Sequence, residues 1–270
     1  MVVDVLKQGQ NTLSDPAQRE ALSQVHNEVK ILIRELQKRV EARDPLVDIN
    51  TVASVEWAYL GLLDGDPTTP RTLHVWLAQK PEFFIEILTL LFRRSDELET
   101  ERPEPSEYDL SRAIQAERLL KSWHRVPGTQ ADGSVDGDAL HAWTQSVQIL
   151  AEKEARRVVA EIRIGNVFAY SPPEKDADTA WPCISVRDVI DEFWSQALAN
   201  GFEVGIIYQR GLDQSTLAEG EAPKERLAKQ YFDWAEASRI EWPKTAACLQ
   251  RVSEHYEAEA RREDAKAKAR

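Results

Sequence analysis

The stretch that most closely matches a metal-binding motif is an acidic, glycine-containing segment between two expected helices. The run Asp132-Gly-Ser-Val-Asp-Gly-Asp138 places side-chain oxygens at positions 1, 3 and 5 and glycine at position 6 of a calcium-binding loop. Position 12, where such a loop needs a bidentate glutamate, is Trp143. The alternative is a polar turn in which Ser134 or Asp136 caps the following helix, whose positive end favours acidic side chains. The sequence favours the turn.

Glu56 is the carboxylate most open to a chemical interpretation, because Val52 and Leu60 lie one helical turn away on either side. Enclosure raises the pKa of a carboxyl unless a cation or hydrogen-bond donors stabilise its charge. Glu56 is therefore either a proton-transfer group or half of an internal polar pair, and structural pairing is the favoured interpretation. By contrast, Glu86 belongs to a polar stripe that we expect to face water, together with Glu82, Thr89 and Arg93.

Two cysteines and one histidine could in principle share a site. Cys248 and His255 lie seven residues apart on one expected helix face, and Cys183 directly follows the Trp181-Pro182 pair. A metal site would need more ligands, and small buried thiols are common core residues, so the core is favoured. The other histidines are scattered one to a helix and are expected at the surface or the edge of the core: His26, His74, His124 and His141.

Common catalytic signatures are missing from the chain. It contains no GxxxxGK[ST] phosphate loop and no GxGxxG, HExxH, GxSxG or CxxC pattern. We therefore assign no catalytic, cofactor-binding or metal-binding residue from the sequence. An enzyme of an unfamiliar all-α type, using Glu56 with an arginine or lysine partner, stays open as an alternative.

The elements that would position these residues are helices. Between residues 14 and 43, apolar residues recur at steps of three and four, and proline stands at the apparent first turn of several segments. Alternating strand patterns are nearly absent. The sequence predicts an all-α chain of about nine or ten helices, arranged as an irregular array or an α-solenoid-like bundle.

The positions of helix ends can be predicted for three parts of this pattern. The pattern from Ala139 to Tyr170 fits two helices, or one helix bent near Gly165. The helix after Trp181-Pro182 is expected to end at Asn200-Gly201. Residues 202–209 are short, β-branched and flanked by glycines, so strand and helix both stay open there.

An acidic segment divides the chain. Residues 95–108 are rich in glutamate and interrupted by prolines, so they can neither pack a core nor continue a helix. We expect an N-terminal helical subdomain over 1–94, a linker or loop over 95–108 and a C-terminal helical subdomain over 109–270. The two subdomains could also pack as one domain.

Composition limits the function classes. The 34 basic and 46 acidic residues give a net charge of −12, which argues against a protein built to neutralise phosphates, so no nucleic-acid partner is expected. No apolar run approaches the roughly 20 residues of a membrane span. The two cysteines are too few for a disulfide framework. A cytoplasmic protein without a membrane partner or bound cofactor is expected.

Several segments resemble the C-terminal helical regions of very large bacterial proteins. They are VEWAYLGLL at 55–63, KPEFFIEILTLLF at 80–92, DGSVDGDALHAW at 132–143, WPCISVRDVI at 181–190 and the ending that starts at Trp242. The resemblance carries no catalytic motif and implies no activity. It implies that the chain is similar to the terminal module of a larger polypeptide, as found in stress or anti-phage systems.

The leading hypothesis is a non-catalytic protein-interaction or scaffolding module. Its eight tryptophans are expected mostly in the core or as wedges between helices, with a minority open to a partner. The partner would be another protein or an attached domain of a larger polypeptide. A homodimer through the long helix near residues 15–43 is a further option, because its spacing suits a helical seam.

Overall fold

The computed structural model describes residues 16–63, 69–97, 104–174, 180–213 and 222–268. Twelve α-helices occur in these ranges, and the only β pairing among them is one isolated bridge between Thr129 and Val135. The predicted all-α class is confirmed, with a few more helices than expected. No helix in the described part of the chain is both long and apolar enough to cross a membrane. The chain divides into two compact units, residues 1–123 and residues 124–270.

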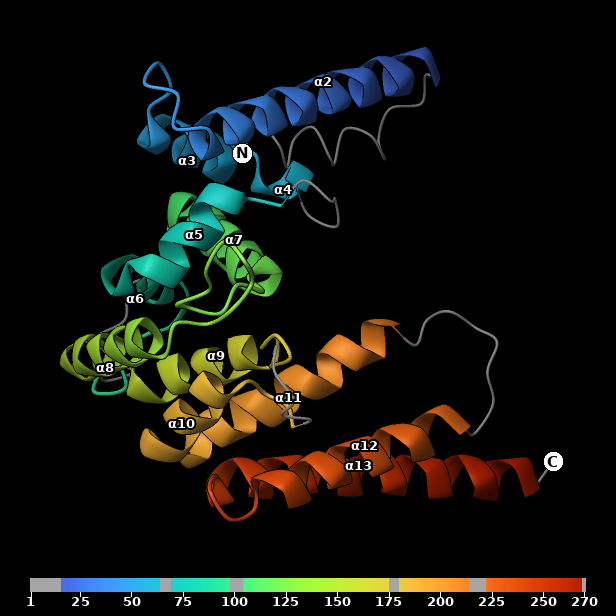
Figure 1. Cartoon of the computed structure of the whole chain (residues 1–270). Coiled ribbons are helices and arrows are strands. Elements are labelled where there is room, and N and C mark those ends of the chain that lie inside the picture. The colour runs from blue at the N-terminus through green and yellow to red at the C-terminus, as the bar shows by residue number, and fades with distance from the viewer. Residues whose placement is uncertain (1–15, 64–68, 98–103, 175–179, 214–221, 269–270) are drawn as a thin grey trace. The chain divides into compact units, whose positions relative to one another are not determined.

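The described residues of the first unit form six helices, which Figure 1 shows from the blue α2 to the green α7. They are α2 (Pro16–Glu41), α3 (Ile49–Ala58), α4 (Leu60–Leu63), α5 (Arg71–Gln79), α6 (Pro81–Leu91) and α7 (Glu107–Ser122). Helix α6 packs against both α5 and α7. Its side chains Phe84, Ile87 and Leu88 are at most 1% exposed, as its nearly continuous apolar sequence predicts.

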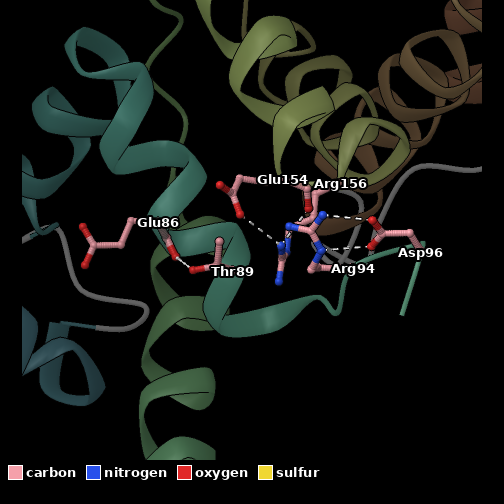
Figure 2. A network of polar contacts seen from close by, with 6 residues as sticks. All are labelled: Glu86, Thr89, Arg94, Asp96, Glu154 and Arg156. Atoms are coloured by element: carbon pink, nitrogen blue, oxygen red, sulfur yellow. Dashed lines mark hydrogen bonds and ion pairs between the residues drawn. The ribbon is translucent and has the colours of Figure 1, made fainter. Parts of the chain in front are cut away.

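The polar stripe of α6 lies at the surface, as expected. Glu82, Glu86, Thr89 and Arg93 are all exposed. In Figure 2 the hydroxyl of Thr89 donates to the backbone oxygen of Glu86 at 2.7 Å, one turn back on the same helix. Just beyond α6, Arg94 binds Asp96 through two parallel bonds of 2.9 Å. Such exposed contacts order the surface locally and contribute little to stability.

Helix α2 confirms the long N-terminal helix, although its buried face is narrower than predicted. Ile33 and Gln37 are 1% and 2% exposed, whereas Val25 and Leu32 are 49% and 58% exposed. The helix ends with Arg43 in the left-handed region (φ 55°). The amide of Asp44 then donates to Arg39 O at 2.9 Å, which is the closing bond of a Schellman motif.

In the second unit, too, six helices lie within the ranges that the structure describes, from the yellow-green α8 to the red α13 in Figure 1. They are α8 (Gly137–Lys153), α9 (Arg157–Phe168), α10 (Ile184–Glu192), α11 (Gln196–Asp213), α12 (Ala222–Ser238) and α13 (Pro243–Lys268). Helices α9 and α11 form one tightly packed pair, and α12 and α13 form another. The stacked rings of Tyr231 and Tyr256, 5.8 Å apart, join α12 to α13.

The predicted stretch from 139 to 170 is two helices, and the break lies at 154–156 instead of Gly165. Ala155 adopts a positive φ of 50°, and the amide of Arg156 donates to Ala151 O at 2.8 Å. This is a second Schellman motif, here formed without glycine. The Arg156 guanidinium also donates to Glu154 O at 2.8 Å, as Figure 2 shows. The helix boundary is therefore fixed by hydrogen bonds that no glycine signals.

The strand option for residues 202–209 is wrong, and so is the helix end at Asn200-Gly201. Helix α11 runs through both. Its glycines allow a close helix crossing: a Cβ on Gly201 would lie 2.1 Å from Ile162 O in α9, and one on Gly165 would lie 2.2 Å from Leu198 O. Small residues spaced four apart let two helix backbones approach in this way, so these glycines serve packing instead of a turn.

The unit boundary differs from the predicted one. We predicted the division at 95–108 and placed α7 in the C-terminal subdomain, whereas the first unit extends to Trp123. Helix α7 packs on α6 and α4, and the Trp123 ring lies 5.5 Å from that of Phe84. Residues 98–103 of the predicted linker lie outside the described residues.

Candidate functional site

The calcium-like segment is a turn followed by a helix cap. Asp132 Oδ1 accepts bonds from the Ser134 amide at 3.0 Å and from its hydroxyl at 2.6 Å. Asp136 is the N-cap of α8 and accepts from the Ala139 amide at 3.1 Å. Asp136 thus has the capping role that the sequence favoured.

Glu56 is enclosed in the first unit with 0% exposure, and it caps a neighbouring helix. Its carboxylate accepts from the amides of Thr72 at 3.1 Å and Leu73 at 2.9 Å, which are the second and third residues of α5. Gln37 Nε2 of α2 donates to it at 2.8 Å. Burial raises the pKa of the Glu56 carboxyl, while these three donors oppose that rise. The group joins α2, α3 and α5.

The two cysteines are buried free thiols in separate surroundings. Cys183 Sγ lies 3.3 Å from Ser171 Oγ, and Cys248 Sγ lies 3.5 Å from Arg251 Nη2. Burial raises the pKa of the Cys248 thiol to about 12, which leaves it protonated and unreactive near neutral pH. Among the residues that the structure describes, no group of three or more potential ligands could hold a metal ion.

The histidines have ordinary structural neighbours, with one exception. His74 bonds Ser122 Oγ at 3.1 Å, and the His124 ring stacks on Tyr170 at 4.0 Å. His26 is buried, and His255 lies 3.8 Å from Glu259. His141 is the exception, because it lies in an acidic cleft of the second unit.

This acidic cleft is the strongest candidate site in the described part of the chain. It has a volume of about 460 Å³ and is formed by the start of α8, one face of α10 and the connection from α12 to α13. Five carboxylates line it, together with one histidine and one tryptophan: Asp138, Asp188, Asp191, Glu192, Glu241, His141 and Trp242. No lysine or arginine is among the lining residues, although the Lys244 ammonium donates to the backbone oxygen of Asp191 at 2.8 Å.

Asp191 holds α13 against α10 and so shapes the cleft. Its carboxylate accepts from the amides of Lys244 and Thr245, both at 2.9 Å, and from the Thr245 hydroxyl at 2.7 Å. These are the second and third residues of α13, whose first residue is Pro243. Since the first amides of a helix lack partners within it, Asp191 caps α13 from a neighbouring helix.

Trp242, the residue just before α13, forms one wall of the cleft. Its indole N–H donates to Asp188 Oδ1 at 2.6 Å, and the Arg187 guanidinium lies over its ring, 4.1 Å from the centroid. Arg187 is only 1% exposed, so its charge lies behind the ring. The ring is thereby fixed in orientation.

Two carboxylates in the cleft do not join one structural element to another. Glu192 pairs with His141 Nε2 at 2.9 Å, and Asp188 and Asp191 are engaged as described. Asp138 and Glu241 are exposed, and the structure shows no side-chain partner for either in the part it describes. Within the ranges that the structure describes, these acidic groups form no cluster that could hold a metal ion. Such a surface suits several cationic groups along one chain better than a single ion.

The sequence analysis missed this site. Its lining comes from residues 137–141, 185–192 and 241–242, which are brought together only by the packing of α10 on α8 and α13. One available signal was the acidic face of the expected helix after Trp181-Pro182, where Asp188, Asp191 and Glu192 share one side.

Comparisons with protein-family models, curated proteins and solved structures gave no match to this chain.

Proposed function

We propose that the chain is a non-catalytic protein-interaction module whose second unit binds a lysine- or arginine-rich segment of a protein partner in the acidic cleft. The observation that carries this proposal is a concave surface lined by five carboxylates and no lysine or arginine. An electrostatic field of one sign in a cleft attracts a ligand of the other sign and speeds its association.

The state of the individual carboxylates supports this function. Asp188, Asp191 and Glu192 are held in position by Trp242, α13 and His141, so the surface is preformed. Asp138 and Glu241 are exposed and available for ion pairs with a ligand. A preformed surface loses little conformational freedom on binding, which favours affinity.

The same surface argues for protein rather than nucleic acid as the partner. The chain carries a net charge of −12, and the cleft adds a local concentration of negative charge that would repel phosphates. Attachment to a larger bacterial system, as the sequence resemblance implies, is part of the proposal: the basic segment would belong to another domain or subunit of that system.

The test is peptide binding to the full chain, measured by fluorescence anisotropy with a labelled deca-lysine peptide and with a deca-glutamine peptide for comparison. We expect saturable binding of the lysine peptide that weakens as salt increases. Asp138→Asn/Glu241→Gln removes two exposed carboxylates, of which only Asp138, in the first turn of α8, contributes to helix stability, and should weaken binding about five- to thirtyfold, from about 0.5–1 kcal/mol for each exposed pair.

A matched control is Glu82→Gln/Glu86→Gln, which removes the same charge from the exposed face of α6 in the first unit. It should leave the peptide affinity within about twofold of the wild type. Equal weakening by both double variants would show that the peptide responds only to net charge, and it would overturn the assignment to the cleft. No binding by the wild type at low salt would overturn the function itself.

A further inference from the structure

A second surface, on the outer side of the α12–α13 pair, has the pattern of a self-association face. A groove of about 420 Å³ runs between the two helices. Ala228 and Ala260 form its buried floor, and Phe232 lies beside them with 41% of its surface exposed. A single exposed apolar side chain is normal on a protein surface, so the case for an interface depends on the charges around the groove.

Charged residues of both signs frame this groove. Glu225 and Lys229 are contributed by α12, and Glu257 and Arg261 by α13. All four side chains are exposed. Lys229 pairs with Asp233 and Arg261 with Glu257, each four residues away on its own helix. Such exposed pairs are worth only about 0.3–0.5 kcal/mol, so they can rearrange when a partner arrives.

The order of these charges is opposite on the two helices. The helices run antiparallel side by side, as the ion pair of Lys224 with Glu259 and the bond from Ser253 Oγ to Ala228 O show. In the direction of increasing residue number on α12, this helix presents Glu225 and then Lys229, an acid and then a base. In the same direction α13 presents Arg261 and then Glu257, a base and then an acid.

This arrangement is complementary to itself under two-fold symmetry. If the two-fold axis lies in the interface and parallel to the helices, α12 of one copy faces α13 of the other, and acids face bases at both ends. If the axis lies in the interface but perpendicular to the helices, α12 packs antiparallel on α12 of the second copy, and α13 on α13. Glu225 then faces Lys229 of the other copy, and Glu257 faces Arg261. Two-fold interfaces use the same patch on both subunits, so this pattern is what an isologous dimer requires.

We infer that the face formed by Ala228, Phe232 and Ala260 and framed by Glu225, Lys229, Glu257 and Arg261 is the dimer interface of this chain, its occupant being a second copy. The Phe232 rings pack into the facing grooves, and the four helices form a bundle.

The available area predicts a weak dimer. Helix α12 has 17 residues. At 1.5 Å per residue and about 10 Å of width for each of two helices, the face measures about 25 by 20 Å, or roughly 500 Å² on each copy. The resulting total of about 1,000 Å² is at the lower limit for a specific interface. The dimer should therefore depend on protein concentration and dissociate on dilution.

The experiment is sedimentation equilibrium on the full chain, with charge-swapped variants. Lys229→Glu/Arg261→Glu makes the frame entirely acidic, and Glu225→Lys/Glu257→Lys makes it entirely basic. Each variant alone should be monomeric, with a dimer dissociation constant about a hundredfold or more above that of the wild type, because like charges then face each other. An equimolar mixture of the two variants should form a heterodimer at least as stable as the wild-type dimer.

The heterodimer separates a lost interface from a lost fold, since misfolded variants would not recover on mixing. Lys38→Glu/Lys121→Glu is the control: both lysines are exposed members of pairs within a helix of the first unit, and their reversal should leave the dimer intact. A wild type that stays monomeric over the whole concentration series would overturn the inference. Two variants that both dimerise alone, or that fold but fail to associate when mixed, would overturn it equally.

Discussion

Replacing Glu56 by alanine should destabilise the first unit strongly, because this side chain is the acceptor for three buried N–H groups from two other helices. It receives the Thr72 and Leu73 amides at the start of α5 and the side-chain amide of Gln37 from α2. Pro70, the N-cap residue of α5, makes no side-chain cap bond. Removal of the carboxylate therefore leaves the first turn of α5 uncapped in an environment that water does not reach.

The expected loss in the free energy of unfolding is about 3 kcal/mol or more, because three buried N–H groups lose their acceptor and each unsatisfied donor costs about 1–3 kcal/mol. Glu56→Gln should cost less, about 1–3 kcal/mol, because its amide oxygen can take the place of Oε1 and accept from Gln37 and Thr72, while its NH₂ group then faces the Leu73 amide, which loses its acceptor. Urea unfolding followed by circular dichroism measures both losses. Amide hydrogen exchange should show faster exchange at Thr72 and Leu73 in Glu56→Ala.

The control is Glu82→Ala on the exposed face of α6, which should stay within about 0.5 kcal/mol of the wild type. A loss below about 1 kcal/mol for Glu56→Ala, with unchanged exchange at the two amides, would refute the capping role.

Three further predictions follow from the same structure. Because burial raises the pKa of Glu56 above its ordinary value of 4.5, the part of its stabilisation that depends on protonation is complete below pH 4.5 and is lost as pH rises through the folded-state pKa, while its hydrogen bonds to α2 and α5 remain. Glu56→Gln lacks this titration, so in urea unfolding its deficit relative to the wild type should narrow, without vanishing, as pH rises above 4.5. Ala155→Gly should raise the melting temperature and stabilise the second unit by about 0.5–1 kcal/mol, because Ala155 has a positive φ of 50° that glycine adopts without strain. Gly201→Ala should cost more than about 2 kcal/mol in urea unfolding, since its Cβ would lie 2.1 Å from Ile162 O, whereas Gly137→Ala, which meets only Ser185 Oγ at 3.2 Å, should cost much less.

The helices could be predicted where local signals agree. Apolar spacing and proline at the first position mark α6, where Pro81 begins the helix as the sequence predicts. Glycine misled the prediction because it has two physical uses. Gly128 supplies a positive φ in a turn, whereas Gly201 lets α9 approach α11, and only the packed structure tells them apart. The break at Ala155 carries no glycine and was not located by the sequence.

The site was less predictable than the fold. Glu56 could be recognised as enclosed because its neighbours on the same helix are apolar, but its partners Thr72 and Gln37 lie 16 and 19 residues away. The residues of the cleft are further apart in the sequence: Trp242 and Asp188, which share a hydrogen bond, are separated by 54 residues. Contacts between residues so far apart in the sequence depend on how the helices pack, which hydrophobic periodicity does not encode.

Both units use a carboxylate from one helix to cap the start of another: Glu56 of α3 caps α5, and Asp191 of α10 caps α13. Each cap binds the second and third amides of a helix that starts at or directly after a proline. In the first unit this carboxylate is sealed from water, but in the second it lines the cleft, so one charge serves both the fold and the surface. Loss of peptide binding in an Asp191 variant would therefore carry no information about recognition. Loss of binding in the Asp138→Asn/Glu241→Gln variant, with stability lowered by no more than the loss of one first-turn carboxylate of α8, would assign binding to the cleft.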